Sequence, residues 1–254
     1  MTDSRRRVTP PGHGSGLWDG YLDRLPRLTV PEIARSLGRG PGSHLLVVAA
    51  HPDDETLGAG RLIAGWADQV GPVSAVTLTA GEACVSQIGV DLPGIADRRR
   101  REWGAAVAVL GARDHGVAGL PDGGLPAAED GVTEEVSRVV DLTAPDLVIG
   151  TAANDPHGDH ATVGRAVGRV AADRGVPWAT FPVWMKYWMG PEDLTQRDGD
   201  LVVIDCGPDA EQRRTAAWAA YPSQSAPLRD DLHEVVPAEM AALLTEQLLF
   251  IPPR

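Results

Sequence analysis

The chain has 254 residues, a formal net charge of −12 and a sequence pI of about 4.9. This length fits one large α/β domain, and a 43% hydrophobic content is enough to fill its core. The excess of acidic side chains would repel nucleic acid and anionic membrane surfaces, so we expect neither as a partner. No apolar run approaches the roughly 18 residues of a membrane span. Two cysteines are too few for a disulfide framework, which indicates a cytoplasmic protein.

The first 43 residues differ from the rest of the chain. Residues 1–16 are rich in Arg, Pro, Gly and Ser and have no apolar period, so they are predicted to form a disordered tail. Residues 17–43 have a mixed pattern that predicts a helical lead-in. The sequence TVPE at residues 29–32 is typical of a helix start.

From residue 44 onwards, apolar runs alternate with helical patterns. This alternation predicts a Rossmann-like α/β fold, a mainly parallel sheet with helices on both faces, in a single domain spanning 44–254. The pattern changes near residue 178, and residues 178–254 are predicted to add an accessory layer or lid. The predicted strands are 44–50, 73–79, 117–120, 146–150, 201–205 and 248–251, and the predicted helices are 56–67, 95–110, 130–143, 160–173 and 210–220.

Two clusters of His and Asp follow two of the predicted strands. His51 and Asp54 stand three residues apart across a strand-to-helix turn, and His160 belongs to the second cluster. Because ligands of open α/β sheets bind beyond the carboxyl ends of the strands, the clusters can converge although about a hundred residues separate them. Two His and one carboxylate form an open catalytic zinc site with a fourth position for water, and they also suit ferrous iron.

The other ionisable groups of the two clusters suit hydrolysis of an amide. Zinc lowers the pKa of a bound water to roughly 7 and polarises a carbonyl oxygen. Asp53 and His157 are then available as the base and the acid. Asp159 lies between the two histidines and is placed to orient one of them by accepting its second N–H. Helix capping explains a single such cluster, but it does not explain two clusters that each end an apolar strand.

Three motifs resemble those of the PIG-L/LmbE-like family of zinc-dependent N-deacetylases, which remove acetyl groups from N-acetylglucosamine units. The motifs are AHPDDETLG at 50–58, TAGEA at 79–83 and HGDH at 157–160, and the resemblance covers roughly residues 44 to 250. For the metal centre, the resemblance implies His51, Asp54 and His160 as zinc ligands, Asp53 as the general base, and His157 as the group that stabilises the oxyanion and helps to protonate the leaving amine.

The same resemblance implies contacts with substrate. Arg99, three residues before a glutamate on the predicted helix 95–110, is expected against the sugar hydroxyls. Glu82 and Asp122 fall where family members contact substrate. Residues 221–225 (YPSQS) resemble a closing motif of a bacterial branch of the family, for which we expect a structural role.

An aromatic stretch follows the second metal motif. Trp184 and Trp188 are candidates to bind the faces of a sugar or an aromatic aglycone, with core packing as the alternative. The sequence as a whole predicts a zinc-dependent hydrolase that removes an acetyl or other acyl group from the amide nitrogen of a small amino-sugar conjugate. Two alternatives stay open: a ferrous oxygenase with the same metal ligands, and a non-catalytic carbohydrate-binding protein.

Overall fold

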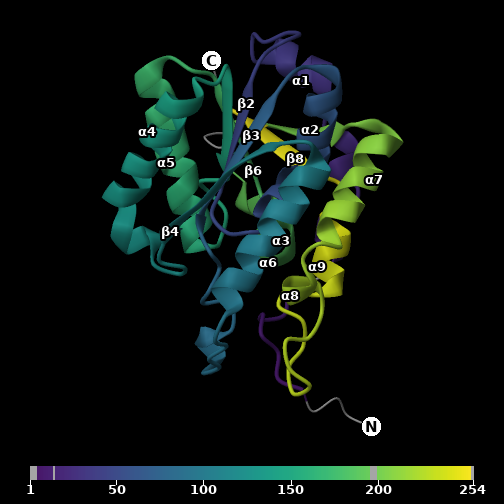
Figure 1. Cartoon of the computed structure of the whole chain (residues 1–254). Helices are drawn as coiled ribbons and strands as arrows, with labels where there is room; N and C mark the ends of the chain where they lie inside the picture. Colours follow the sequence, from purple (N-terminus) through teal and green to yellow (C-terminus); the bar gives the residue numbers. More distant parts are fainter. Residues whose placement is uncertain (1–4, 14, 195–198, 253–254) are drawn as a thin grey trace.

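The computed structural model describes residues 5–13, 15–194 and 199–252. Its strands are β1 (Arg27–Thr29), β2 (Leu45–Ala49), β3 (Val73–Thr79), β4 (Arg113–Leu120), β5 (Leu147–Thr151), β6 (Trp178–Phe181), β7 (Asp200–Asp205) and β8 (Leu248–Ile251). They form one eight-stranded sheet in the order β1-β7-β8-β6-β5-β2-β3-β4 (Figure 1). All neighbours pair in parallel except that β8 runs antiparallel to β6 and β7. The predicted Rossmann-like, mainly parallel sheet is confirmed.

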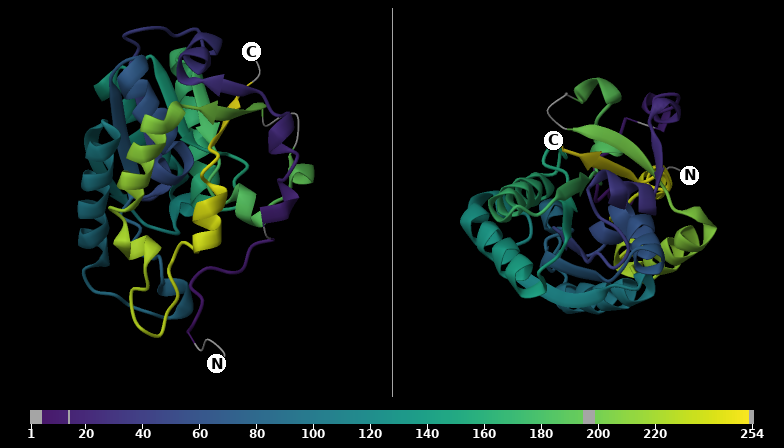
Figure 2. Two further views of the ribbon diagram at one scale, coloured as in Figure 1. Left: turned by 90° about the vertical axis from the view of Figure 1, so that its right-hand side faces the viewer. Right: turned by 90° about the horizontal axis from the view of Figure 1, so that it is seen from above.

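Helices cover both faces of this sheet, as Figure 2 shows from above. They are α1 (Val30–Ser36), α2 (Asp54–Gln69), α3 (Ile95–Leu110), α4 (Glu129–Thr143), α5 (Gly158–Arg174), α6 (Met185–Trp188), α7 (Gly207–Trp218), α8 (Pro222–Ser225) and α9 (Ala238–Leu243). Within the described ranges, no helix combines the length and apolar character that crossing a membrane requires.

The apolar side chains of β2 belong to two separate hydrophobic cores, one on each face of the sheet. Successive side chains of a strand point to opposite faces. Leu45 and Val47 therefore pack with residues of α2, α3 and α7, whereas Leu46 and Val48 pack with residues of α4 and α5. Both faces are covered, which is why this strand is apolar at every position.

The lead-in segment contains a strand as well as the predicted helix. Thr29 caps α1, because its backbone N–H and its hydroxyl both donate to Glu32 Oε2, at 2.8 and 2.7 Å. Residues 27–29 form β1, which pairs with β7 at the edge of the sheet. Three residues are too few to show a strand period, so sequence patterns did not indicate β1.

The C-terminal third needs a correction. Residues 178–194 and 199–252 do not form a separate layer or lid over the domain, since β6, β7 and β8 extend the main sheet. Helix α7 packs beside α2 and α3 on the same face. The strands of this region are short, and their partners lie far away in the sequence. Their membership of the main sheet was therefore not visible in local patterns.

The predicted disordered tail also needs a correction over residues 5–13. Arg6 forms a parallel bridge with Leu232, and Val8 is only 3% exposed. Val8 packs in a small apolar cluster with residues from two other loops, including Val85 and Val235. These partners are distant in sequence, so the segment shows no apolar period of its own. Residues 1–4 and 14 of the predicted tail lie outside the described residues.

Candidate active site

The two His/Asp clusters meet at the carboxyl edge of the sheet, where β2 and β5 are neighbours. The chain leaves β2 for α2 on one face and leaves β5 for α5 on the other, a topological switch point at which α/β proteins bind ligands. A cavity of about 800 Å³ opens there, and its lining includes His51, Asp53, Asp54 and His157. The structure thus brings together the clusters that the sequence predicted to converge.

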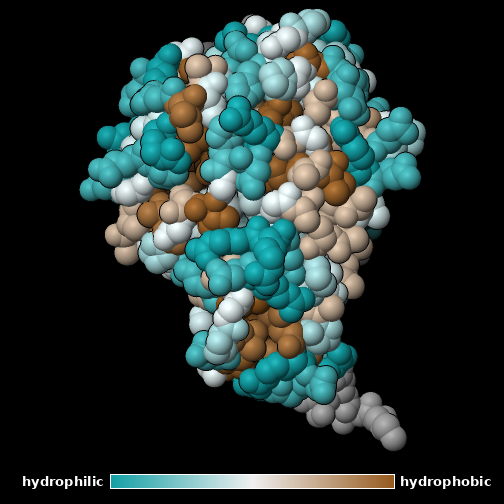
Figure 3. Space-filling view, viewed as in Figure 1, coloured by the Kyte–Doolittle hydropathy of each residue, from teal (hydrophilic) through white to brown (hydrophobic). Residues whose placement is uncertain are grey.

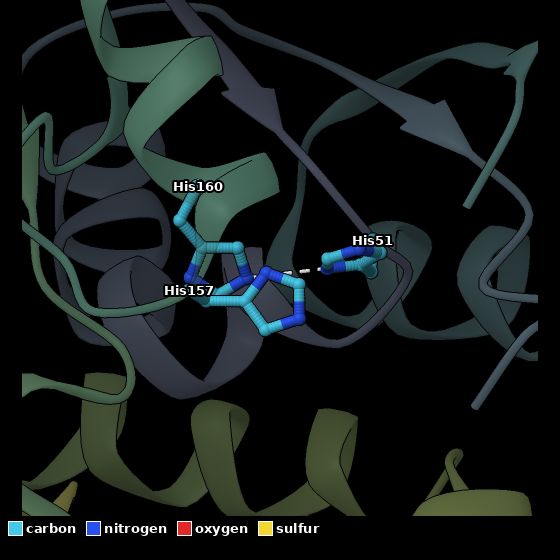
Figure 4. A group of neighbouring side chains, drawn as sticks. All are labelled: His51, His157 and His160. Carbon is cyan, nitrogen blue, oxygen red and sulfur yellow. Dashed lines mark hydrogen bonds between the residues drawn. The ribbon is translucent and has the colours of Figure 1, made fainter. Parts of the chain in front are cut away.

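Three side chains at this point, those of His51, Asp54 and His160, have donor atoms with the spacing of a metal-ligand set. His51 Nδ1 lies 3.1 Å from His160 Nε2, and Asp54 places Oδ2 at 3.4 Å from the first and Oδ1 at 3.2 Å from the second. Tetrahedral ligands held at about 2.0–2.1 Å from zinc lie about 3.3 Å from one another. These two histidines and His157 also form a group able to hold a metal ion (Figure 4). The donor set therefore fits a divalent metal.

Neighbouring carboxylates determine which ring nitrogen of His51 is free for a metal. His51 Nε2 lies 3.0 Å from Asp159 Oδ2 and 3.0 Å from Asp122 Oδ1, so in the neutral ring the proton belongs on this nitrogen and the lone pair on Nδ1. Asp159 also accepts hydrogen bonds from the backbone N–H groups of Gly123 and Leu125. The sequence analysis expected Asp159 to orient one of the two histidines of its own motif, His157 or His160; in the structure its carboxylate contacts His51 instead, from the other motif.

Asp155 is a site residue that the sequence analysis did not single out. Its Oδ1 lies 3.3 Å from His160 Nδ1, and its Oδ2 accepts the backbone N–H groups of Val183 and Trp184, both at 2.9 Å. Burial lowers the pKa of His160, but Asp54 and Asp155 raise it to about 9. Binding of a metal at His160 Nε2 would therefore release a proton.

His157 lies against the other two imidazoles. Its ring stacks on that of His160 with centroids 4.6 Å apart and meets His51 edge-on at 4.9 Å. Burial lowers the pKa of His157 to about 4, and the two neighbouring histidines also lower it. Within the described part of the chain, its buried Nδ1 has no hydrogen-bond partner. His157 is therefore neutral at pH 7 and has a ring nitrogen available to a ligand.

Asp53 adopts a backbone conformation that is rare for a residue with a side chain, with φ 113° and ψ −29°. Glu55 Oε2 accepts its backbone N–H at 3.0 Å, and Arg99 Nη2 lies 3.2 Å from its Oδ2. Burial raises the pKa of Asp53 to about 8, against the opposing effect of Arg99. The carboxyl group is thus held in a fixed position and is readily protonated near neutral pH.

A second buried hydrogen-bond network, which the sequence analysis missed, is connected to Asp53 through Glu55. The Tyr221 hydroxyl donates to Glu55 Oε1 at 2.7 Å, and both residues are completely buried. Burial raises the pKa of Glu55 to about 7. Next to Tyr221, the backbone N–H of Ser223 donates to Glu102 Oε1 on α3 at 3.1 Å. The segment 221–225 therefore ties α2 and α3 together beneath the site.

Arg99 is 3% exposed and lies on the pocket wall, but the groups it contacts belong to the protein. Besides Asp53, it donates to Gly81 O at 2.8 Å and to Pro52 O. Gly81 has φ 64°, and a Cβ there would occupy the position of the guanidinium. Arg99 Nε has no partner among the described residues. These contacts use three of the five N–H donors of Arg99, so the expected contact with sugar hydroxyls is limited to the remaining donors unless Arg99 moves.

Asp122 and Glu82, both expected to contact substrate, make hydrogen bonds and ion pairs within the protein. Asp122 lines the pocket, but its Oδ1 contacts His51 and its Oδ2 accepts the backbone N–H of Ala83 at 2.6 Å. Glu82 is exposed, is not part of the pocket lining, and accepts the backbone N–H of Asp122 at 3.1 Å. In this structure the two residues position one another and His51.

Trp184 and Trp188 both line the pocket, as expected of residues that contact substrate. Their rings stack on each other with centroids 4.3 Å apart and 14° between planes. Both side chains are half-buried. The two tryptophans therefore pack against the protein and also line the cavity, so core packing and substrate binding are compatible roles for them.

Lys186 lies between these tryptophans in sequence and points away from the pocket into the protein. Only 2% of it is exposed, and its ammonium donates to the carbonyl oxygens of Leu243 and Glu246 at the end of α9. Burial lowers the pKa of Lys186 to about 7 from an ordinary value of 10.5, and the positive charges of Arg214 and Arg61 also lower it. The folded chain therefore disfavours protonated Lys186.

We expect the free energy of unfolding to rise between pH 7 and about pH 10 because of Lys186. In this window the unfolded chain binds a proton that the folded chain lacks, so raising the pH favours folding, on the order of a few kcal/mol in total. The variant Lys186→Met should lack this rise when urea unfolding is measured across the window. Arg174→Met, which removes an exposed cation, should keep it. Identical pH slopes for all three proteins would contradict the prediction.

The fold and donor set define an α/β protein with a His/Asp site able to bind a metal at the carboxyl edge of its sheet. The PIG-L family model, described as GlcNAc-PI de-N-acetylase, matches residues 46–171. A Nocardia farcinica protein named 1D-myo-inositol 2-acetamido-2-deoxy-alpha-D-glucopyranoside deacetylase is 30% identical over 246 residues, covering 78% of each chain. The chain belongs to the PIG-L family.

Other relatives have the same kind of name. A Rhodococcus erythropolis protein with the name of the Nocardia protein is 31% identical over 189 residues, which cover 61% of this chain and 62% of that protein. This chain therefore spans less than two thirds of the Rhodococcus relative.

Solved structures share the fold at low sequence identity. N,N'-diacetylchitobiose deacetylase from Pyrococcus horikoshii superposes with a TM-score of 0.58 and 20% identity over 75% of this chain and 72% of that one. A deacetylase of the teicoplanin biosynthesis pathway superposes with a TM-score of 0.61 and 20% identity over 72% and 85%. These likenesses extend the evidence for the fold beyond the residues that the family model matches.

Proposed function

We propose that this protein is a zinc-dependent amidohydrolase that removes an acetyl or related acyl group from the nitrogen of an amino-sugar conjugate. The observation that carries the proposal is the triangle of His51 Nδ1, Asp54 and His160 Nε2 at 3.1–3.4 Å, in a cavity that Asp53 and His157 also line. The deacetylase names of the relatives support the reaction, and they favour it over the oxygenase and the non-catalytic alternatives.

The residues around the metal position divide the chemistry between them. A divalent ion held by His51, Asp54 and His160 would polarise the amide carbonyl and acidify water. Asp53, fixed by Arg99 and Glu55, takes the proton of the attacking water. His157 donates a hydrogen bond to the developing oxyanion.

Collapse of the tetrahedral intermediate then breaks the C–N bond. A proton delivered through Asp53 or His157 converts the nitrogen to a neutral amine as it leaves, and the acyl group departs as a carboxylate. Asp159, Asp122 and Asp155 do not react in this scheme. They hold the rings of His51 and His160 in the orientation that binding requires.

We place the reaction in a reducing compartment such as the cytoplasm, since both cysteines, Cys84 and Cys206, are free thiols. The proposal is tested by incubating the zinc-loaded protein with a panel of N-acetylglucosaminides and measuring the primary amine released. The expected result is stoichiometric amine and acetate from at least one glycoside, with none from protein treated with a chelator. Absence of amine from every member of a broad panel, with zinc bound, would refute the function.

A further inference from the structure

The N-terminal segment outside the matched family region forms one wall of the active-site cavity. Residues 6–10, here called the strap, lie far before residue 46, where the family match begins. Arg7, Val8, Thr9 and Pro10 nevertheless belong to the pocket lining together with His51 and Asp53. Figure 2 shows the purple N-terminal segment rising past the C-terminal loops towards α6. The strap therefore shapes the space next to the metal centre.

Hydrogen bonds hold the strap at several points. The backbone N–H of Arg6 donates to Asp231 O at 2.8 Å, and the N–H of His233 donates to Arg6 O at 3.0 Å. The Arg6 guanidinium also reaches Ile88 O at 3.2 Å and Asp231 Oδ2 at 3.1 Å. One arginine thus joins the strap to two loops that are distant in sequence. On the lower part of the molecule, Figure 3 shows hydrophobic residues gathered between hydrophilic ones.

The far end of the strap reaches the aromatic segment. Thr9 Oγ1 donates to Val235 O at 2.5 Å, and Trp188 Nε1 lies 3.4 Å from Pro10 O. Val8 and Pro10 therefore share this part of the cavity with the stacked pair Trp184 and Trp188. The strap and the tryptophans form a continuous wall.

The character of the lining changes from one end of the cavity to the other. Of the described lining residues, the acidic ones are Asp53, Asp54 and Asp122, which all adjoin or contact His51. The wall around the strap contains the apolar residues Val8, Pro10, Ile88, Val235 and Val236, together with the polar residues Arg7, Thr9, Ser86 and Gln87. Although the chain has a net charge of −12, the described lining residues on this side of the cavity include no carboxylate.

We propose that the strap and the Trp184–Trp188 pair form a subsite for an apolar, planar aglycone of the amino-sugar substrate. This inference rests on the proposed function, which places the acylated sugar at the metal end. The cavity of about 800 Å³ lies high in the range of roughly 300–1,000 Å³ found for ligand pockets. It is larger than a single monosaccharide would fill. Indole rings and apolar side chains bind a flat hydrophobic group by burial and stacking.

The test compares the binding of two glycosides by calorimetry, 4-nitrophenyl and methyl N-acetylglucosaminide. It uses zinc-loaded protein in the Asp53→Asn background, where turnover is suppressed. The aryl glycoside is expected to bind at least about tenfold more tightly than the methyl glycoside. Burial and stacking of the aryl group that contribute ~1.4 kcal/mol to the binding free energy correspond to this factor. Adding Val8→Asp places a carboxylate in the apolar wall and should reduce the preference to within about threefold. Val109→Asp, on the exposed side of α3, is the matched control and should keep it.

Arg6→Ala, which releases the strap without altering a lining side chain, is the second variant and should weaken the aryl preference if Val8→Asp fails to fold. Equal binding of the two glycosides, or a preference that survives both strap variants, would overturn the subsite. Tight, Val8-dependent aryl binding by a wild-type protein that releases no amine from either glycoside would leave the subsite standing and refute the proposed function instead.

Discussion

Replacing Asp53 by Asn is expected to lower kcat about 10²- to 10⁴-fold, the usual contribution of a general base. The amide cannot take a proton from water, but it is nearly the same size as the carboxylate. Steady-state release of amine from the best glycoside of the panel measures the effect. Zinc content and thermal midpoint, measured on the same samples, should match those of the wild type.

Asn is the appropriate replacement because of the backbone at this position. Asp53 has φ 113°, and Asn tolerates positive φ better than other residues with a side chain. Its side-chain oxygen can also still accept from Arg99, which contacts Asp53 Oδ2 in the native protein. Any loss of activity then reports on proton transfer rather than on a rebuilt turn.

The matched control is Asp141→Asn, which removes an exposed carboxylate on α4 and should leave turnover within about twofold of the wild type. If Asp53→Asn protein with bound zinc retained full activity, Asp53 would not be the base. His157 would then be the remaining ionisable group of the two motifs to examine in that role.

The convergence of the two His/Asp clusters was predictable because each motif is local and directly follows a strand of a parallel sheet. His51 and Asp54 follow a buried strand directly, as the second cluster follows β5, and the rule for carboxyl ends of parallel strands brings the clusters together. The prediction needed no knowledge of the sheet order beyond the neighbourhood of these two strands. The resemblance to a family added the roles of individual residues to this placement.

The supporting residues were not predictable for the opposite reason. Asp155 has the appearance of a turn residue, and only the fold shows its carboxylate between His160 and the start of the aromatic segment. Tyr221 meets Glu55 across 166 residues of sequence, so no spacing connects them. The strap likewise depends on Arg6 reaching loops near residues 88 and 231. Contacts of this kind are specified by tertiary structure, and they leave no periodic signal in the chain.

Zinc is expected to raise the thermal midpoint of the wild-type protein by about 5–10 °C when its free concentration is 100-fold above the dissociation constant. Binding to the folded state alone contributes ~2.7 kcal/mol under those conditions. For a chain of this size each kcal/mol shifts the midpoint by roughly 2–4 °C. A stronger chelator should reverse the shift and abolish release of amine, and added zinc should restore both.

The variant His160→Ala should lose both responses, because it removes one of the three proposed metal ligands, whose donor atoms lie 3.1–3.4 Å apart. His115→Ala is the matched control, since His115 is a half-buried histidine that bonds Ser74 Oγ at 3.0 Å and belongs to neither metal motif. It should keep the zinc-dependent shift. A thermal shift of the same size in His160→Ala and the wild type would mean that zinc binds elsewhere on the protein, and the assignment of the metal centre would have to be abandoned.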